Sequence, residues 1–440
     1  MEVRFPEDFL FGTATSSHQI EGGNIYNEWY MWERKGKLPE CGLACNSWNL
    51  YDEDIKLMAE LGYNAYRFSI EWSRVQPKQG VWNDKAIKKY LKVVKALKEY
   101  SIEPIVTLHH FTNPAWFFLR KGWEKTENVV FFTEYVEKIV EELVEHVKIW
   151  VTINEPSVYA YMGWVSGEYP PFKNNVLLYF RVLRNVLRAH AQAYKIIKRF
   201  DINSWIGIAK HFPVFQPAKK YILDQIIVDT ADYNFNCIIV EALDKGILPG
   251  LFIHRKYKEL KGTYDYWGVN YYTRQVLKFN PTRIFTLFAQ PLKRVSEEVT
   301  DMGWDVYPEG LYNVLMRLKR SGKPIIITEN GIATRDDRQR ICFIVRHLYQ
   351  VWRAMNEGVD VRGYMYWSFI DNYEWVEGFK PRFGLVEVDY ESFERKPRES
   401  ALFYGKLARE KKIDEKYLNA CLSKAKKLKM LGSSTCDSSS

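Results

Sequence analysis

A chain of 440 residues and 52.1 kDa, with 47% hydrophobic and 16% aromatic residues, is long enough for one large or two smaller domains and is not intrinsically disordered. The formal charge of +9 is spread thinly, and its lysine-dense part lies near the end, from Lys406 to Lys429, so we expect no nucleic-acid partner. No run of 18 apolar residues occurs, and the first residues lack the pattern of a signal peptide, which predicts a cytoplasmic protein.

Short runs of β-branched and aromatic residues predict the strands. In chain order, we expect strands in FLFGTA (from Phe9), NAYRFSI (from Asn64), EPIVTLH (from Glu103), VKIWVTIN (from Val147), SWIGIAK (from Ser204), DYWGVNYY (from Asp265), PIIITEN (from Pro324) and VRGYMYWSF (from Val361). The run from Ile325 to Thr328 is typical of a strand that is covered on both faces of a parallel sheet.

Amphipathic segments separate most of these strands. One is DKAIKKYLKVVKALKEY, from Asp84, in which apolar residues recur at helical spacing. No low-complexity linker divides the chain. The alternation therefore predicts an α/β fold, a single (β/α)8 TIM barrel with extended βα loops over residues 1–430. We expect the Ser-rich end from Leu431 to Ser440 to be a disordered tail or an expression remnant outside the fold.

Polar and aromatic residues stand at the ends of the predicted strands, where the loops of such a barrel form the active face. These residues are His109, His110, Asn154, Glu155, Asn270, Tyr271, Tyr272, Glu329, Asn330, Trp367 and Ser368, while Arg67 lies inside the second strand. Taken alone, Glu329 would be a surface ion pair or a helix cap. Because Glu155 ends the fourth strand and Glu329 the seventh, however, we expect the two carboxyls to meet at one end of the barrel.

Two carboxyls on either side of one bond suit glycoside hydrolysis, in which one protonates the leaving oxygen and the other supports the cation-like anomeric carbon. Other chemistries have no motif in the sequence. It contains no HExxH, GxGxxG, GxxxxGK[ST] or GxSxG segment, so we expect neither metal nor cofactor. His109 and His110 are neighbours in a strand and should point to opposite faces, so they cannot readily share a metal. For either one, the alternative is a histidine packed in the core.

The six cysteines lack zinc-ligand or redox spacing, so we expect reduced thiols, with Cys41 and Cys45 the pair that could still bridge. Scarce glutamine with abundant lysine and glutamate indicates a thermophile, whose intracellular proteins can keep disulfides.

Five segments resemble the family 1 glycoside hydrolases, the β-glucosidase and β-galactosidase group, across nearly the whole chain. The segments are FLFGTATSSHQIEG (from Phe9), YRFSIEWSRVQP (from Tyr66), TINEP (from Thr152), ITENG (from Ile327) and YWSFIDNYEWVEGFKPRFGL (from Tyr366). The resemblance implies a retaining exo-β-glycosidase that hydrolyses β-glucosides and β-galactosides through a covalent glycosyl-enzyme.

The same resemblance implies the catalytic roles. Glu329 would be the nucleophile, and Glu155 would be first the acid and then the base. Arg67 would pair with Glu329 and keep it ionised, and Tyr272 would donate a hydrogen bond to the same carboxylate. For Arg67, a purely structural ion pair is compatible with this role.

Residues for sugar binding also follow from the resemblance: Gln19, His110, Asn154, Trp367, Glu374 and Trp375. Core packing is the alternative for each tryptophan, but Trp375 follows a loop sequence that does not suggest a core position. Glu374 would repel a 6-phosphate, so we expect unphosphorylated glycosides. Ile153 and Phe111 depart from the usual pattern, which leaves glucose, galactose, fucose and mannose open. A cis peptide between Trp367 and Ser368 is a further expected family feature.

Two other functions stay open, a transglycosylase and a non-catalytic sugar-binding barrel; the presence of both Glu155 and Glu329 argues against the second. The segments KFNPTRIFTLFAQPLK (Lys278–Lys293) and VYAYMGWVSGEYPPF (from Val158) should lie on the rim of the barrel mouth. They either pack on the barrel's helices or form an apolar aglycone site, which with flanking basic residues would also touch a membrane surface.

Overall fold

The computed structural model describes residues 2–249, 254–283, 288–293 and 295–423. Eight parallel strands close into a barrel in the spatial order β10-β13-β14-β2-β3-β4-β5-β6. Their bounds are Leu10–Ala14 (β2), Ala65–Ser69 (β3), Glu103–His109 (β4), Ile149–Asn154 (β5), Trp205–His211 (β6), Tyr266–Asn270 (β10), Ile325–Asn330 (β13) and Val361–Trp367 (β14). Each predicted strand overlaps one of these, with β6 ending one residue beyond its predicted run, which confirms the predicted TIM barrel.

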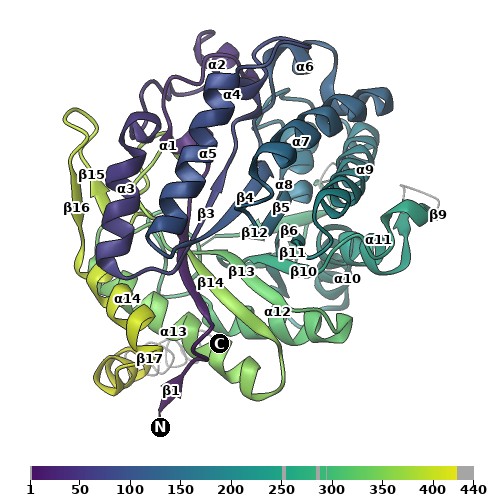
Figure 1. Ribbon diagram of the computed structural model, residues 1–440. Coiled ribbons are helices and arrows are strands. Elements are labelled where there is room, and N and C mark those ends of the chain that lie inside the picture. Colours follow the sequence, from purple (N-terminus) through teal and green to yellow (C-terminus); the bar gives the residue numbers. More distant parts are fainter. Residues whose placement is uncertain (1, 250–253, 284–287, 294, 424–440) are drawn as a thin grey trace.

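Helices surround the barrel (Figure 1). The α-helices are Ser17–Ile20 (α1), Glu28–Glu33 (α2), Ser47–Leu61 (α3), Trp72–Val75 (α4), Asp84–Glu99 (α5), Ala115–Leu119 (α6), Val129–Leu143 (α7), Pro156–Tyr161 (α8), Val176–Phe200 (α9), Ile222–Asp232 (α10), Ile238–Lys245 (α11), Pro308–Leu318 (α12), Asp337–Asn356 (α13) and Glu399–Glu410 (α14). The predicted amphipathic segment forms α5, which buries Ile87, Tyr90 and Val94 at helical spacing.

Shorter elements complete the fold. Two turns are π-helical, Met162–Ser166 (η3) and Tyr233–Cys237 (η4), and the 3-10 turns are Gly122–Glu124 (η1), Thr126–Asn128 (η2), Lys258–Leu260 (η5), Lys319–Ser321 (η7) and Trp375–Glu377 (η8). Outside the barrel, Val3–Arg4 (β1) pairs with Lys412–Ile413 (β17), Ile247–Pro249 (β8) with His254–Lys256 (β9), and Val386–Val388 (β15) with Arg395–Pro397 (β16).

A three-stranded sheet lies beyond the ends of β6 and β10. It consists of Ala289–Leu292 (β12), Arg274–Phe279 (β11) and Val214–Pro217 (β7), in that order. Helix α10 packs on it through Ile227 and Val228, which meet Leu277. Because β7 follows β6 and β11 follows β10, this sheet lies on the rim of the barrel mouth. The predicted rim segment 278–293 belongs in part to it, but Ile284, Phe285 and Leu287 lie outside the described residues.

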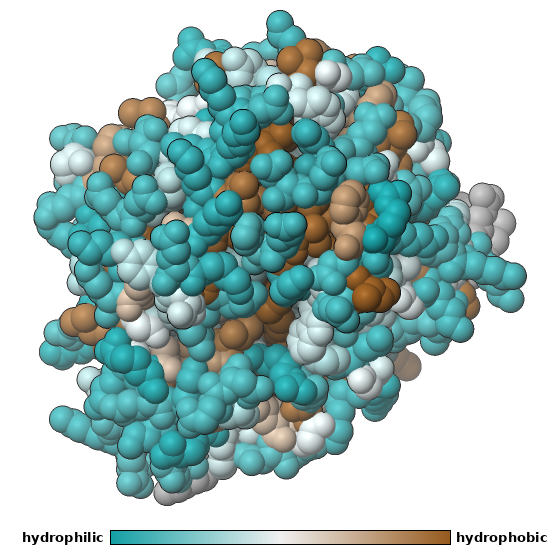
Figure 2. Space-filling view, in the orientation of Figure 1, coloured by the Kyte–Doolittle hydropathy of each residue, from teal (hydrophilic) through white to brown (hydrophobic). Residues whose placement is uncertain are grey.

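The core has two layers. Small and aliphatic side chains such as Ala65, Val151 and Ile326 fill the inside of the barrel. A larger cluster lies between the barrel and the helices, and it includes Trp72 and Trp123. Figure 2 shows a mostly hydrophilic outer face with scattered hydrophobic residues. No helix among the described residues is long and apolar enough to cross a membrane.

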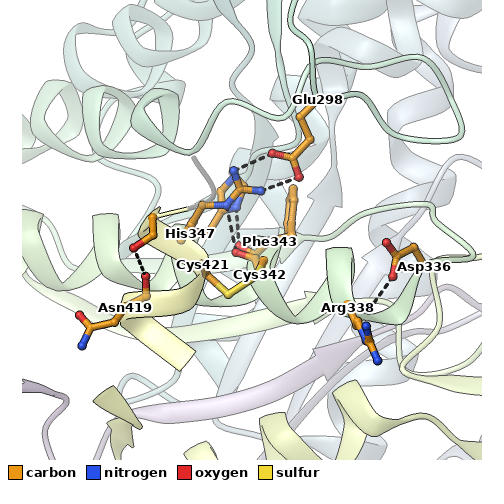
Figure 3. The surroundings of a disulfide bond; sticks show 10 residues. Glu298, Asp336, Arg338, Cys342, Phe343, His347, Asn419 and Cys421 are labelled. Atoms are coloured by element: carbon orange, nitrogen blue, oxygen red, sulfur yellow. Dashed lines mark hydrogen bonds and ion pairs between the residues drawn. A yellow bond between two sulfur atoms is a disulfide. The ribbon is translucent and has the colours of Figure 1, made fainter. Parts of the chain in front are cut away.

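The prediction for the cysteines was wrong in part. Cys342 of α13 forms a disulfide with Cys421, 79 residues away, which ties the end of the described chain to the barrel's helical layer (Figure 3). Cys41 and Cys45 are free and buried. The bridge depends on the docking of two distant segments, with Cα atoms 5.1 Å apart, and such proximity leaves no signal in local spacing. The tail from Leu431 lies outside the described residues and stays a prediction, as does the boundary at residue 430.

Candidate active site

The carboxyl ends of the barrel strands bring Glu155 and Glu329 together. Glu329 lies on β13, and Glu155 directly follows β5, at the N-terminus of α8, with a left-handed backbone (φ 45°). Both residues are buried, at 8% exposure for Glu155 and 4% for Glu329. Burying two carboxyls is costly unless donors or protons compensate for the lost water. The donors around the two groups differ.

Two side chains donate short hydrogen bonds to Glu329. Arg67 of β3 donates from Nη1 to Oε1 at 2.6 Å, and the Tyr272 hydroxyl donates to Oε2 at 2.6 Å. Each oxygen thus accepts a short bond, one of them from a full positive charge. Donors of this kind favour the ionised carboxylate.

Arg67 is fully buried, and its remaining donors are used inside the barrel. Its Nε donates to Thr107 Oγ1 at 3.0 Å, and Nη2 donates to Asn154 Oδ1 at 2.7 Å. Nη1 also reaches the backbone carbonyl of Thr328 at 3.1 Å. A guanidinium held from three sides cannot swing away from Glu329. The predicted ion pair and the predicted Tyr272 contact are therefore both present.

Glu155 has a poorer set of partners. Asn270 donates from Nδ2 to Glu155 Oε1 at 2.8 Å, and His211 Nδ1 lies 3.9 Å from the same oxygen. Burial, and next the negative charge of Glu329, raise the pKa of Glu155 to about 8. Glu155 is thus protonated at neutral pH, which a general acid requires.

Gln19, Glu374 and Trp367 form one side of the predicted sugar site. Gln19 Nε2 lies 3.3 Å from Glu374 Oε2 and donates at 2.7 Å to the Tyr373 carbonyl. Burial and the charge of Glu329 raise the pKa of Glu374 to about 8, against hydrogen bonds from Gln19 and Trp367. These three predicted residues lie together beside Glu329.

His110 connects the two tryptophans of the predicted sugar site. Its ring is stacked on Trp367 (centroids 5.9 Å apart) and on Trp375 (6.2 Å). Asn154 Nδ2 lies 3.0 Å from His110 Nε2, so that nitrogen is the acceptor and Nδ1 carries the hydrogen. Burial holds the pKa of His110 well below its usual value, so the ring is neutral. Among the described residues the buried Nδ1 has no partner, so it is a donor available to a ligand.

Trp375 differs from the expectation of a non-core position. It is 4% exposed and packs against Trp29 and Phe111 as well as His110. The loop doubles back, because Glu374 donates its backbone N–H to the Gly378 carbonyl, and this turn carries the indole inward. The predicted cis peptide between Trp367 and Ser368 is present.

The burial of aromatic side chains bears on two other predictions, for His109 and for the segment from Val158. His109 faces away from His110 and packs on Trp123 and Tyr159, as the strand alternation predicts. In the second rim segment, Tyr159 and Trp164 are buried, which favours the packing alternative there.

Among the described residues, no group of three or more His, Cys, Asp or Glu side chains is placed to hold a metal ion.

Sequence reasoning missed several residues at this site. Asn270 was recognised only as the end of a strand, yet it bonds Glu155 and accepts a bond from Thr328 Oγ1 at 2.6 Å. Lys210 and His211, at the end of β6, were not considered. The signal was available for His211, because it ends its strand as Asn154 ends β5. A buried lysine next to it has no sequence signature.

Comparisons with known proteins agree with this geometry. The model of the glycosyl hydrolase family 1 matches residues 1–413. Beta-glucosidase A of Thermotoga maritima is 33% identical over 94% of this chain and 99% of its own length. A solved β-glycosidase from Pyrococcus horikoshii superposes with a TM-score of 0.91 at 46% identity, covering 96% of this chain and 98% of its own. The T. maritima family 1 enzyme solved in complex with isofagomine lactam gives 0.88 at 33% identity, covering 94% and 100%.

Proposed function

We propose a mechanism for this chain, which belongs to glycosyl hydrolase family 1. The chain is a glycoside hydrolase of the β-glucosidase type, and the family's reaction retains the configuration at the anomeric carbon. One observation carries our assignment of roles, the unequal environment of the two buried carboxyls. Glu329 accepts from Arg67 and Tyr272, whereas Glu155 has a raised pKa.

In the first step, the Glu329 carboxylate attacks the anomeric carbon of a β-glycoside. A bond forms between Glu329 and that carbon as the bond to the leaving oxygen breaks. Glu155 gives its proton to the leaving oxygen, so the aglycone departs as an alcohol and Glu155 becomes a carboxylate. The proton and the electron pair of the broken bond both leave with the aglycone.

In the second step, water opens the glycosyl ester. Glu155 takes a proton from the water as the water oxygen attacks the anomeric carbon, and Glu329 leaves as a carboxylate. Esterification has removed the charge on Glu329, which was one cause of the raised pKa of Glu155. The same group that was an acid in the first step is therefore a better base in the second. Both carboxyls end as they began.

We assign binding of the glycone hydroxyls to Gln19, His110, Asn154 and Glu374, with Trp367 and Trp375 as ring surface. The neutral His110 has a donor at Nδ1 that no described residue uses, and Gln19 and Glu374 lie side by side. Glu374 puts a half-buried carboxyl where a 6-phosphate would need a cation, which supports unphosphorylated substrates. The experiment is the ratio of kcat/KM for aryl β-glucoside and its 6-phosphate, which we expect to favour the glucoside strongly; a preference for the phosphate would contradict the assignment.

The test of the nucleophile is covalent trapping. A 2-deoxy-2-fluoro-β-glucoside with a good leaving group should inactivate the enzyme, because the fluorine slows opening of the ester more than its formation. After proteolysis, mass spectrometry should find the added sugar on the peptide that contains Glu329. Inactivation with the label on another carboxyl would overturn the assignment of Glu329 but not the glycosidase activity.

We also propose that the rim beside α10 receives apolar aglycones and touches a membrane surface. Tyr221, Ile222, Leu223 and Ile226 are exposed, at 62%, 77%, 47% and 50%. The exposed Lys219 and Lys220 precede them, so the patch combines apolar side chains with basic charge. Helix α10 packs on the rim sheet with its other face, which leaves this one uncovered by the described residues.

Two measurements separate the parts of that proposal. kcat/KM for alkyl β-glucosides should rise from methyl to dodecyl below the micelle concentration, with up to about 0.8 kcal/mol gained per buried CH₂. Flotation with vesicles containing anionic lipid should carry the protein, and a variant with Ile222→Ser and Ile226→Ser should float less. A flat series contradicts the aglycone site, and absence of flotation contradicts the membrane contact.

We further infer a thermophilic source. Lysine and glutamate are abundant and glutamine is scarce, a pattern that is enriched in hyperthermophiles. A relative and solved neighbours from Thermotoga and Pyrococcus support the inference.

A further inference from the structure

Lys210 is a buried cation at the end of β6, beside the site but outside the mechanism described above. Its side chain is fully buried. On the same strand, Ile208 belongs to the cluster between barrel and helices, whereas Ala209 faces the barrel interior. Because side chains alternate along a strand, Lys210 points into the layer behind the mouth and His211 points into the mouth. A charge in an apolar layer needs partners that stabilise it.

All of the partners of Lys210 favour a protonated amine. Its Nζ donates to the carbonyl of His211 and to Asn236 Oδ1, the latter at 3.2 Å. It also lies over the rings of Phe212 and Phe235, at 4.4 and 4.8 Å from the centroids. Carbonyl oxygens and ring faces accept hydrogen bonds or attract cations, and none of them offers a proton. These partners therefore oppose the effect of burial, which disfavours the ammonium form.

The π-helical turn η4 supplies two of those partners, Phe235 and Asn236. Asn236 Nδ2 donates to the Pro213 carbonyl and to Asp232 Oδ1, both at 2.9 Å, so its Oδ1 is left facing Lys210. Asp232 is itself held by two bonds from Arg317 of α12. Turns of this kind are rare and occur often at functional sites. The turn fixes Lys210 in place from the side away from the mouth.

Lys210 stands in the chain between two residues that contact Glu155. The backbone N–H of Glu155 donates to the carbonyl of Ala209, at 2.7 Å, and the neighbouring His211 lies 3.9 Å from the Glu155 carboxyl. Attraction to Lys210 lowers the pKa of Glu155, against the rise caused by burial and by Glu329. Among the described residues, Arg67 is the other cation that acts on Glu155 in this way, and it is committed to Glu329.

We propose that Lys210 is a positioning residue for the second half-reaction, where its charge behind Glu155 favours the carboxylate that activates water. The proposal rests on the proposed role of Glu155. In the glycosyl-enzyme, loss of the charge on Glu329 and the presence of the charge on Lys210 act in the same direction. Water can then be deprotonated at a lower pH than the buried position of Glu155 would otherwise allow.

The charge on Lys210 is present in the pH range that matters for this step. Burial lowers its pKa to about 7, and the carboxylate of Glu155 opposes that fall. Below about pH 7 the ammonium therefore predominates. His211 stays neutral in this range because burial, and next the charge of Lys210, lower its pKa to about 3. The titratable or charged groups that act on Lys210 from neighbouring elements include Glu155, Asp232, Cys237 and Arg317. Those that act on Glu155 include Glu329, Arg67 and Lys210. His211 Nδ1 lies 3.9 Å from Glu155 Oε1.

The test uses Lys210→Met, which keeps most of the volume and removes the charge. With 2,4-dinitrophenyl β-glucoside the first step is fast, so kcat reports opening of the glycosyl-enzyme; a pre-steady-state burst of dinitrophenol verifies this. Removing the cation makes Glu155 harder to ionise. The acid limb of kcat should therefore move up by about one pH unit in Lys210→Met. The limb should stay in place in Lys245→Met, which removes an exposed lysine from the following helix α11.

A second variant covers the case in which Lys210→Met does not fold. Asn236→Ala removes one acceptor of the ammonium and should move the acid limb in the same direction by less. A lowered rate with an unmoved limb, in either folded variant, would show a merely structural role and overturn the proposal. Rescue of Glu155→Ala by azide is measured in parallel. Absence of that rescue would show instead that the role of Glu155 itself is wrong.

Discussion

The two carboxyls at the barrel mouth are buried to a similar degree, yet their surroundings differ. Glu329 accepts one bond from a guanidinium and one from a phenol, both at 2.6 Å. Glu155 accepts one from an amide at 2.8 Å, and its pKa is raised. Burial alone would push both toward the neutral form. We therefore propose that the donors contributed by β3 and by the end of β10, not depth in the protein, decide which carboxyl attacks and which one gives a proton.

Removing Glu329 should have the largest effect. Glu329→Gly cannot form the glycosyl ester, so kcat for aryl β-glucosides should fall by about 10⁴-fold or more. The control is Glu60→Gln, on the surface of α3, which should retain full activity. Circular dichroism and thermal unfolding verify that the variant is folded. Near-normal turnover by folded Glu329→Gly would contradict the nucleophile assignment.

Glu155→Ala should lose activity in a way that depends on the substrate. For poor leaving groups, kcat/KM should fall by about 10²- to 10⁴-fold, the usual contribution of a general acid. Dinitrophenyl glucosides need little protonation, so their first step should suffer much less. Azide needs no general base, so it should restore turnover and yield glucosyl azide. Equal losses for all leaving groups would contradict the assignment of Glu155 as the general acid.

Arg67→Met tests the cation that pairs with Glu329. Without the guanidinium, the buried Glu329 carboxylate loses its ion-pair partner, so kcat/KM should fall by about 10²-fold or more. Arg67→Lys keeps a positive charge and should lose less. Near-normal kcat/KM in folded Arg67→Met would mean that the ion pair only holds the structure together.

Asn270→Ala should have the smallest effect. The Asn270 amide lowers the pKa of Glu155, so its removal should raise that pKa further. The basic limb of kcat/KM, expected near pH 8, should then move up by about half a unit. The control is Asn356→Ala, whose amide donates to a carbonyl within α13. A basic limb that moves down, or not at all, would show that Asn270 does not act on Glu155.

The barrel could be predicted because each strand has its own local pattern. A β-branched run such as Ile325–Ile327 is apolar on both faces, and the order of strands in a closed parallel barrel follows the order in the chain. Glu155 and Glu329 followed from their places at strand ends. Their different donors did not follow from pattern alone, and only the resemblance to a family pointed to Arg67 and Tyr272.

Features that depend on the docking of distant segments could not be predicted. The Cys342–Cys421 bridge joins residues 79 apart, and Trp375 is buried because a loop turns inward. Lys210 has the sequence context of an ordinary strand end, and its burial comes from the π-helical turn that covers it. In each case the side chains that cover or bond the residue come from distant segments, which a local window does not contain.

The most direct test of the central claim is the titration of Glu155 itself, before and after the charge on Glu329 is removed. In protein labelled with ¹³C at the glutamate carboxyls, NMR can follow the Glu155 resonance, which Glu155→Gln identifies by its absence. We expect a pKa well above that of an ordinary glutamate in the free enzyme, and a fall of about one unit or more once a 2-fluoroglucosyl group esterifies Glu329. A pKa that is ordinary in the free enzyme, or equal in the two states, would contradict the account.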